Sequence, residues 1–311
     1  MSGAFNHRPG QRQPVPPMRG IALLFVLWAT ALLTLIIGGY VLIAHVEHLQ
    51  ARNLADTTRA RYYAEAGLHR AVLEMRMPDP VTRWVADGRN YTFHLDDIPI
   101  EVSLTDESGK LDLNIADEHA LTNFLRGRGA EEEEAVALAH AIIDWRDADD
   151  EAQPYGAESS DYRRAGYPYG AKNAYFDTVA ELQQVMGMSY ELYRKLEPAV
   201  TVYAGRNQPN PAYAPADALL ALPDMTPEMA EEFVELRRAM PIGDPTMAGM
   251  RTLPDGTPVM AGGGGFTYSV RSKATLPNGA YGLLEATIRI GGAAANGRPF
   301  VILRWRDNEN G

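Results

Sequence analysis

The pattern of apolar and polar residues begins with a long charge-free run. Residues 21–44 (IALLFVLWATALLTLIIGGYVLIA) contain no Asp, Glu, Lys or Arg. A helix rises about 1.5 Å per residue, so this run would be roughly 36 Å long, enough to cross a hydrocarbon core of about 30 Å. The pattern therefore predicts a transmembrane helix over residues 21–44.

The helical pattern continues beyond the apolar run. Residues 45–75 contain no proline and one glycine, Gly67. Apolar residues recur there at helical spacing: Leu49, Leu54, Ala55, Ala60, Tyr63, Ala66, Ala71 and Met75. Pro78 ends the pattern. We expect residues 45–77 to form the amphipathic half of the same helix, packed on a folded domain.

The charges on either side of the apolar run predict its orientation. Residues 1–20 carry three arginines and no acidic residue, whereas mixed charges follow the run. The positive-inside rule therefore places residues 1–20 in the cytoplasm and the bulk of the chain outside it. A cleaved secretory signal peptide is the alternative, although the run is long for one and lacks a clear small-residue exit site.

Two strands are predicted directly after the long helix. Apolar residues alternate over residues 91–95 and again over residues 98–104, and Asp96-Asp97 supplies turn residues between them. We therefore expect residues 78–105 to begin a pilin-like α/β domain with an antiparallel sheet.

Strand alternation returns towards the C-terminus, over residues 266–270, 284–290 and 300–303. Asn278-Gly279 and Asn296-Gly297 lie where hairpin turns are expected. Before these strands, proline and glycine are frequent over residues 241–265, which predicts a long loop. We assign residues 241–311 to the same domain as the first two strands.

The stretch between the two groups of strands is helical in pattern and strongly acidic. From Asp106 to Arg238 it holds 26 acidic and 12 basic residues, a net −14 in a chain whose total is −11. We predict an inserted α domain over residues 106–240, and hence an α+β fold with a long N-terminal helix packed on a small antiparallel sheet. Two independent domains in series are the alternative.

Composition limits the classes of function. The net charge of −11 argues against nucleic acid as the main partner. The chain has no cysteine, which excludes disulfides, thiolate metal sites and cysteine nucleophiles. No GxSxG or HExxH motif is present. We therefore expect no enzymatic activity.

The densest group of reactive side chains is an acidic loop, DWRDADDEAQPYGAESSDY, over residues 144–162. Its carboxylates share a single base, Arg146, and like charges repel unless a cation neutralises them. The spacing counted from Asp147 approaches that of a calcium-binding loop, but Ala152 stands where an EF-hand requires glycine. The loop predicts a calcium site, with a solvated acidic surface as the alternative.

Two segments of the acidic stretch echo one another 37 residues apart: Leu182, Val185, Met188 and Leu196 recur as Leu219, Leu222, Met225 and Phe233. Each segment resembles a helix-hairpin-helix unit, and residues 116–143 resemble a looser third copy. Such units grip nucleic-acid phosphates through backbone N–H groups. Acidic residues follow both turns here, so a structural packing role is favoured.

A basic leader that ends in Gly20, followed by an apolar helix that continues as an amphipathic one, resembles a type IV pilin-like protein. The resemblance implies cleavage by a prepilin peptidase between Gly20 and Ile21 and methylation of the new N-terminus. In most such proteins the fifth mature residue is Glu, which pairs with the N-terminal amine of a neighbouring subunit, but here it is Phe25. That departure resembles the minor pseudopilin K (GspK) family of the type II secretion system.

The GspK resemblance implies a non-enzymatic protein anchored in the inner membrane, with the bulk of the chain in the periplasm. A buried amine in lipid needs a counter-charge. A subunit with Phe25 has no carboxylate at this position to neutralise the amine of a subunit above it. It is therefore expected only at the tip of the filament. Other minor pseudopilins, the major pseudopilin, and the secretin or exported substrates are the implied partners, and nucleic acid is not.

The acidic loop also resembles the DW-x-D-x-D … GAE … Y motif at which this family binds calcium. Matching positions give Asp147, Asp149 and Glu158 as the first-choice ligands, and Asp144, Asp150 and Asp161 as the second choices. Two other classes of protein stay open as alternatives. One is a membrane-tethered DNA receptor with helix-hairpin-helix units, and the other is a calcium-dependent membrane-anchored hydrolase.

Overall fold

The computed structural model describes residues 21–79, 81–239, 253, 256, 264–291 and 297–308. Two compact units divide the chain, Met1–Ala55 and Asp56–Gly311. Helix α1 (Ile21–Met75) contributes residues to both units. It is the one helix in the described part of the chain that is long and apolar enough to cross a membrane, as the charge-free run predicts.

In the first unit, the side chains of α1 are almost all exposed. Leu49 and Leu54 are 45% and 70% exposed and Ala55 is exposed too, so the expected packing on a folded domain does not extend to these three positions. The physical reason is that this unit contains no other described element for the helix to pack on. The helix ends at Met75, two residues before the predicted end.

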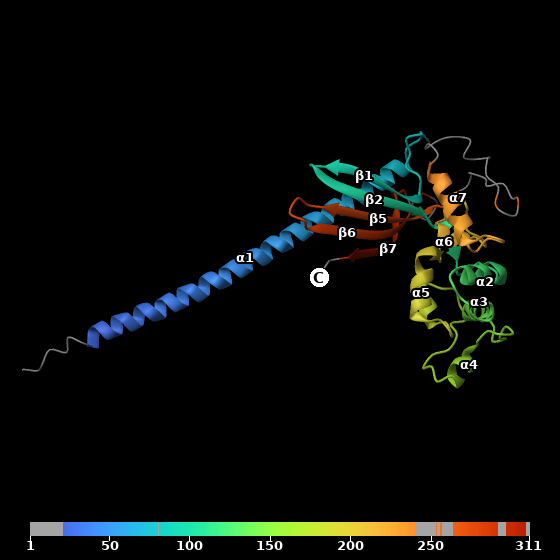
Figure 1. Cartoon of the computed structure of the whole chain (residues 1–311), viewed down its shortest axis with the longest axis horizontal. Coiled ribbons are helices and arrows are strands. Elements are labelled where there is room, and N and C mark those ends of the chain that lie inside the picture. Colours follow the sequence, from blue (N-terminus) through green and yellow to red (C-terminus); the bar gives the residue numbers. More distant parts are fainter. Residues whose placement is uncertain are drawn as a thin grey trace, which may run out of the picture. The chain divides into compact units, whose positions relative to one another are not determined.

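The second unit contains a five-stranded antiparallel sheet with the strand order β1-β2-β5-β6-β7 (Figure 1). Its strands are β1 (Asp87–Leu95), β2 (Ile98–Asp106), β5 (Thr267–Thr275), β6 (Tyr281–Arg289) and β7 (Val301–Asn308). Strand β2 pairs directly with β5, across more than 150 residues of intervening chain. The strands on either side of the helical stretch therefore form one sheet, in the predicted α+β fold.

Two tight turns link neighbouring strands as the sequence predicts. Asp96 and Asp97 join β1 to β2 with φ angles of 48° and 63°, the left-handed pair that a two-residue hairpin requires. Asn278-Gly279 lies between β5 and β6, with Gly279 at φ 88°. The third predicted turn includes Asn296, which lies outside the described residues, as does most of the predicted loop 241–265.

The end of α1 packs on one face of the sheet through small residues. Its buried positions include Ala60, Ala64, Gly67 and Ala71, which let the helix backbone approach the strands closely. A Cβ atom at Gly67 would collide with the side chain of Ser272 on β5. The core between helix and sheet is completed by alternate strand residues: Ile100, Val102, Leu104, Val270, Leu284, Ala286 and Ile288.

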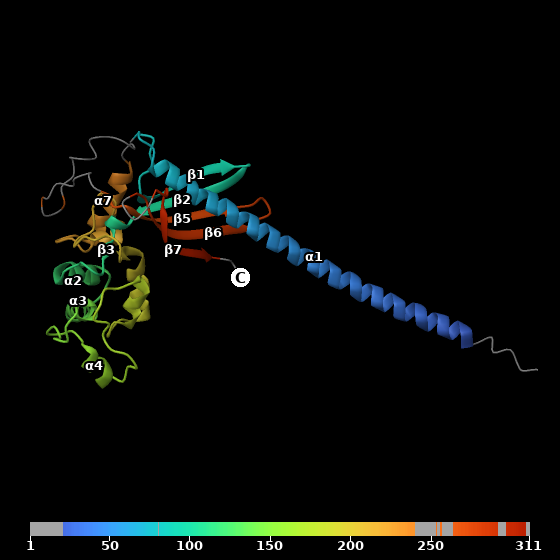
Figure 2. The same ribbon diagram turned by 180° about the vertical axis from the view of Figure 1, so that it is seen from behind.

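The inserted stretch folds around a second core of its own. It contains α2 (Glu118–Gly127), α3 (Glu132–Arg146), α4 (Ser159–Arg164), α5 (Tyr190–Leu196), α6 (Ala216–Leu219) and α7 (Pro227–Ala239), with short 3-10 turns η1 (Glu107–Gly109), η2 (Val179–Gln184) and η3 (Glu197–Ala199). A short parallel ladder joins β3 (Leu111–Asp112) to β4 (Val200–Thr201). Figure 2 shows α2 and α3 lying side by side.

Both echoing segments have a helical element on either side of a short turn. The first is η2 followed by α5, and the second is α6 followed by α7. Gly187 and Asp224 have left-handed φ angles of 86° and 57° in the two turns. The first element is 3-10 in one copy and only four residues long in the other. The helix-hairpin-helix assignment and the exact domain boundaries stay predictions.

Candidate metal site

Three of the predicted ligands lie together at one point in the inserted stretch. Asp147, Asp149 and Glu158 each offer an oxygen within 4.8 Å of the others, and no other such group of three is found among the described residues. Asp147 caps the C-terminus of α3 and Glu158 caps the N-terminus of α4. The loop between these helices thus folds back on itself and brings its two ends together.

Glu158 is the buried member of this carboxylate triad. The residue is 2% exposed, and its side chain faces the backbone N–H groups at the start of α4 in a capping box with Asp161, but neither carboxylate oxygen makes a well-formed hydrogen bond among the described residues. Oδ1 of Asp147 is likewise buried without a partner in the described part of the chain. Buried anionic oxygens normally accept hydrogen bonds or bind cations. The triad thus has buried carboxylate oxygens whose charge the protein satisfies incompletely.

The electrostatics of the triad show uncompensated negative charge. Burial, together with the charges of Asp144 and Asp147, raises the pKa of Glu158 to about 7. Burial and the neighbouring Asp149 also raise the pKa of Asp147. Each shift means that the protein alone disfavours the ionised carboxylates. A cation would reverse this balance.

Arg146, the single base in the loop sequence, does not neutralise these carboxylates through a hydrogen bond or ion pair. Its guanidinium donates to the backbone carbonyl of Ala116, 2.5 Å from Nη2, and to that of Leu113. The arginine therefore ties α3 to the segment before α2. The single base of the loop is thus a backbone anchor.

The three second-choice residues lie outside the triad, and each has partners of its own. The backbone N–H of Gln153 donates to both oxygens of the fully buried Asp144, at 3.2 Å each. Asp161 accepts from the backbone of Glu158 at 3.1 Å and pairs with an exposed arginine. Asp150 accepts a hydrogen bond as well. These carboxylates hold the loop in shape around the triad.

Two further residues fix the loop and were not identified from the sequence. The side-chain amide of Asn173 donates to the carbonyl of Asp149 and to Oδ1 of Asp150, both at 2.9 Å. Asn173 has φ 49°, a conformation that asparagine tolerates better than most residues. Gly156 lies against Asp144, where a Cβ atom would collide with the carboxylate. Asn173 is 15 residues or more from the triad in sequence, so spacing alone gave no signal.

The donor set fits a hard divalent cation. All three side chains offer carboxylate oxygens, which suit calcium, and the site contains no softer sulfur or imidazole donor. The buried oxygens without partners and the raised pKa values agree with this chemistry. The residues present therefore fit calcium.

The predicted processing and assembly positions lie at the other end of the chain. Ile21 is the first described residue of α1, and Gly20 lies outside the described residues. Phe25 is 70% exposed in the first unit. It belongs to an apolar helix surface that has no partner among the described residues of that unit.

Helix α1, the sheet beside its second half and the inserted acidic stretch define a pilin-like α+β protein with an apolar N-terminal helix. The family model of type II secretion system protein K matches residues 103–205. Proteins of that name are 30% identical to this chain in Klebsiella pneumoniae, over 60% of the chain and 63% of the relative, and in Pseudomonas aeruginosa, over 70% and 72%. The chain therefore belongs to the type II secretion system protein K family.

A solved structure agrees on the fold. The crystal structure of the GspK-GspI-GspJ complex from enterotoxigenic Escherichia coli contains a chain that matches with a TM-score of 0.57 and 20% identity, over 84% of this chain and all of that chain. Family membership confirms the predicted class, a minor pseudopilin of the type II secretion system. Neither the DNA-receptor alternative nor the hydrolase alternative is supported by these relatives.

Proposed function

We propose that this protein caps the tip of the type II secretion pseudopilus. We propose further that it is anchored in the inner membrane and has its second unit in the periplasm. The observation that carries this proposal is family membership combined with Phe25 at the position where a glutamate would pair with a neighbour's amine. A subunit without that carboxylate leaves the amine of a subunit above it uncompensated in an apolar environment. The tip is the position that needs no such partner.

The apolar half of α1 supplies the surface for assembly. Its side chains are exposed in the first unit, from Ile21 through Ile43, and such helices associate through close packing in a membrane or filament core. In the solved complex, GspK is assembled with GspI and GspJ. We propose that this chain assembles with the corresponding minor pseudopilins of its own system. We assign it no catalytic step.

Calcium at the triad is the structural part of this proposal. Asp147, Asp149 and Glu158 would hold the ion, which would neutralise their charges and cross-link the two ends of the α3–α4 loop. The support comes from the buried carboxylate oxygens that have no partner among the described residues. An ion here serves as a staple in a chain that has no cysteine for disulfides.

Immunogold labelling of assembled pseudopili tests the tip position. Antibodies against the inserted stretch are expected to mark one end of each filament and to leave its length unmarked. Labelling along the length would overturn the tip assignment. Antibodies against the major pseudopilin provide the control, because they are expected to mark the whole filament.

Terbium emission tests the calcium assignment separately. Terbium replaces calcium among oxygen ligands and is sensitised by nearby aromatic side chains, and Trp145 precedes the triad by two residues. The full chain in detergent is expected to give sensitised emission that calcium displaces and that Glu158→Gln removes. Emission that is equal in the wild type and in Glu158→Gln would refute the calcium assignment and leave the tip proposal standing.

A further inference from the structure

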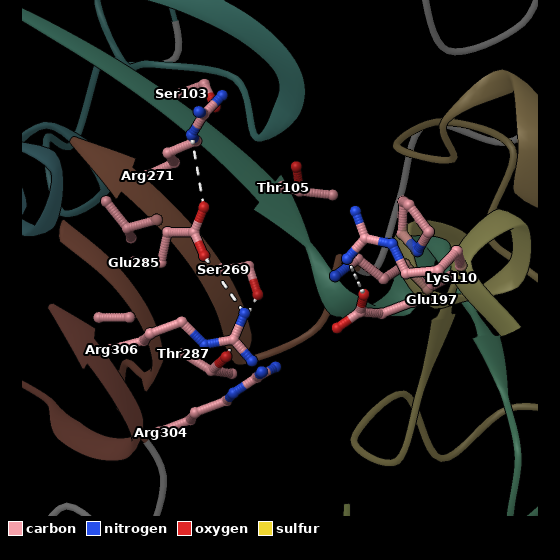
Figure 3. Close-up of a pocket in the computed structure, with 14 residues that line it drawn as sticks. Ser103, Thr105, Lys110, Glu197, Ser269, Arg271, Glu285, Thr287, Arg304 and Arg306 are labelled. Carbon is pink, nitrogen blue, oxygen red and sulfur yellow. Dashed lines mark hydrogen bonds and ion pairs between the residues drawn. The ribbon is translucent and has the colours of Figure 1, made fainter. Parts of the chain in front are cut away.

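A positively charged cleft lies on the face of the sheet that α1 does not cover. It has a volume of about 420 Å³ and lies between strands β2, β5, β6 and β7 and the α5–η3 segment (Figure 3). Its charged lining residues are five bases and two acids: Lys110, Arg194, Arg271, Arg304 and Arg306, with Glu197 and Glu285. Concentrated positive charge on a chain of net charge −11 indicates an anionic ligand.

Two of the bases have acidic partners of their own, since Lys110 pairs with Glu107 at 2.7 Å and Arg194 lies 3.6 Å from Glu197. The three arginines of the strands face one acidic residue. Glu285 is shared, since it lies 3.4 Å from Nε of Arg271 and 3.8 Å from Nη1 of Arg306 (Figure 3). Arg304 makes no ion pair with any residue that the structure describes. Burial raises the pKa of the Tyr193 hydroxyl, and the charges of Arg304 and Arg306 oppose the rise. The positive charges of Arg304 and Arg306 on β7 therefore influence Tyr193, which lies on α5.

Strand β7 forms the outer edge of the sheet. It is last in the strand order, and its outer edge pairs with no other described strand. Arg304 and Arg306 are exposed and alternate with inward-facing residues, so they lie on one face of β7, about 6.6 Å apart along the strand. Exposed cations on an edge strand repel a second copy of that edge and admit a strand of opposite charge.

We propose that this cleft binds an extended, carboxylate-rich segment of a partner protein, which lies along β7 with its acidic side chains against Arg304 and Arg306. Guanidinium groups bind carboxylates through paired hydrogen bonds. Side chains two residues apart on an extended segment repeat at the same spacing as those on β7, so two carboxylates meet two arginines. Hydroxyl groups on the neighbouring strands line the cleft floor: Ser103, Thr105, Ser269 and Thr287. This surface is independent of the calcium triad.

Fluorescence anisotropy with a labelled hexaglutamate peptide tests the proposal on the full chain in a non-ionic detergent. Hexaglutamate is expected to bind, hexaglutamine is not, and the affinity should fall as salt is added. Arg304→Gln/Arg306→Gln should weaken binding about five- to tenfold. The matched control is Arg76→Gln/Arg163→Gln, which removes the same charge from exposed positions outside the cleft and should change the affinity less than twofold.

Several outcomes would overturn the proposal. Equal loss of affinity in both double variants would show unspecific attraction to positive charge. Equal binding of hexaglutamine would remove the role of carboxylates, and competition by inorganic phosphate at matched charge would make the cleft a small-anion site. If the cleft variant fails to fold by circular dichroism, Arg304→Gln alone is decisive, because this arginine has no ion pair with a described residue to lose. Unchanged affinity in that single variant would contradict the proposal.

Discussion

Asp87 and Glu158 are both buried carboxylates, 1% and 2% exposed, in opposite surroundings. Asp87 pairs with Arg89 through two hydrogen bonds of 2.8 and 2.9 Å, and Arg237 lies 3.7 Å away. Glu158 has no ion pair among the described residues, and its oxygens face only the backbone N–H groups that begin α4, without a well-formed hydrogen bond. The chain supplies its own cations at one site, and we propose that an external ion supplies the charge at the other.

The pKa values of the two carboxyls express the same contrast. Burial opposes ionisation of Asp87, but the hydrogen bonds and charge of Arg89 outweigh it, and the pKa lies below its usual value. Burial raises the pKa of Glu158, and its acidic neighbours raise it further. The first site contributes stability to the chain as it stands. If the calcium proposal is right, the second contributes stability only when the ion is bound.

Removal of the Asp87 charge is expected to have the largest effect on stability. Asp87→Asn leaves two buried or half-buried arginines without their counter-ion, which should cost about 3–5 kcal/mol of unfolding free energy. Urea denaturation of the full chain in detergent measures it. Glu191→Gln, which removes the exposed pair with Lys195, is the control and should cost less than about 1 kcal/mol. A similar small cost for both variants would remove the contrast.

Calcium is expected to have the next largest effect, and only through the triad. At a hundred times its dissociation constant, the ion should raise the unfolding free energy by about 2.7 kcal/mol. Chelation should reverse the gain in thermal melts, and Glu158→Gln should abolish it. Asp87→Asn should keep the full calcium increment, since its site is separate. Loss of the increment in Asp87→Asn would show that the two sites are coupled.

In chelator, Asp87→Asn should lower the unfolding free energy, whereas Glu158→Gln should not. Glu158→Gln removes an uncompensated buried charge, so its unfolding free energy should equal or exceed that of the wild type. Urea denaturation with chelator present compares the two variants. A large loss of stability in Glu158→Gln under these conditions would mean that the protein itself compensates the carboxylate.

Substitution of Gly156 is expected to have an intermediate effect on the unfolding free energy. In Gly156→Ala the added methyl group meets the carboxylate of Asp144, so the loop must shift at a cost of about 1–3 kcal/mol. The calcium increment should shrink as well. Ala152→Ser, an exposed change in the same loop, should stay within about 0.5 kcal/mol. Equal melting temperatures for both variants would show that the loop geometry is not needed.

The smallest expected effect is the acid dependence of the Asp87 pair. Because the folded-state pKa lies below the ordinary 3.8, the stabilisation is complete above that value and is lost as the pH falls through the lower folded-state pKa. Urea denaturation from pH 6 down to acid conditions should show a fall in stability that Asp87→Asn lacks. Parallel pH profiles for the two proteins would exclude the ion pair as the cause.

The sequence predicted much of the fold and the centre of the candidate site because both depend on local pattern. Alternation and the Asp96-Asp97 turn located β1 and β2, and the loop motif located the triad. The direction of Arg146 was not predictable, because its acceptors lie 30 and 33 residues away. The burial of Arg237 beside Asp87 depends on contacts across about 150 residues of chain.

The basic cleft was also beyond the sequence pattern. Alternation indicated a strand over residues 300–303, but not which face α1 would cover. The register of β7 on β6 places Arg306 opposite Glu285 and Arg304 opposite Thr287. Only this register, together with the position of α5, brings the arginines to one cleft. The pairing of β7 with β6 thus determines where the arginines lie, which the local spacing of residues does not predict.

Titration calorimetry of calcium into the chelator-treated full chain would decide whether the acidic loop binds the ion. We expect saturable binding to the wild type and to Asp87→Asn, and none to Asp149→Asn/Glu158→Gln. Absence of binding to the wild type, or equal binding to the double variant, would contradict the claim that the acidic loop depends on an external cation.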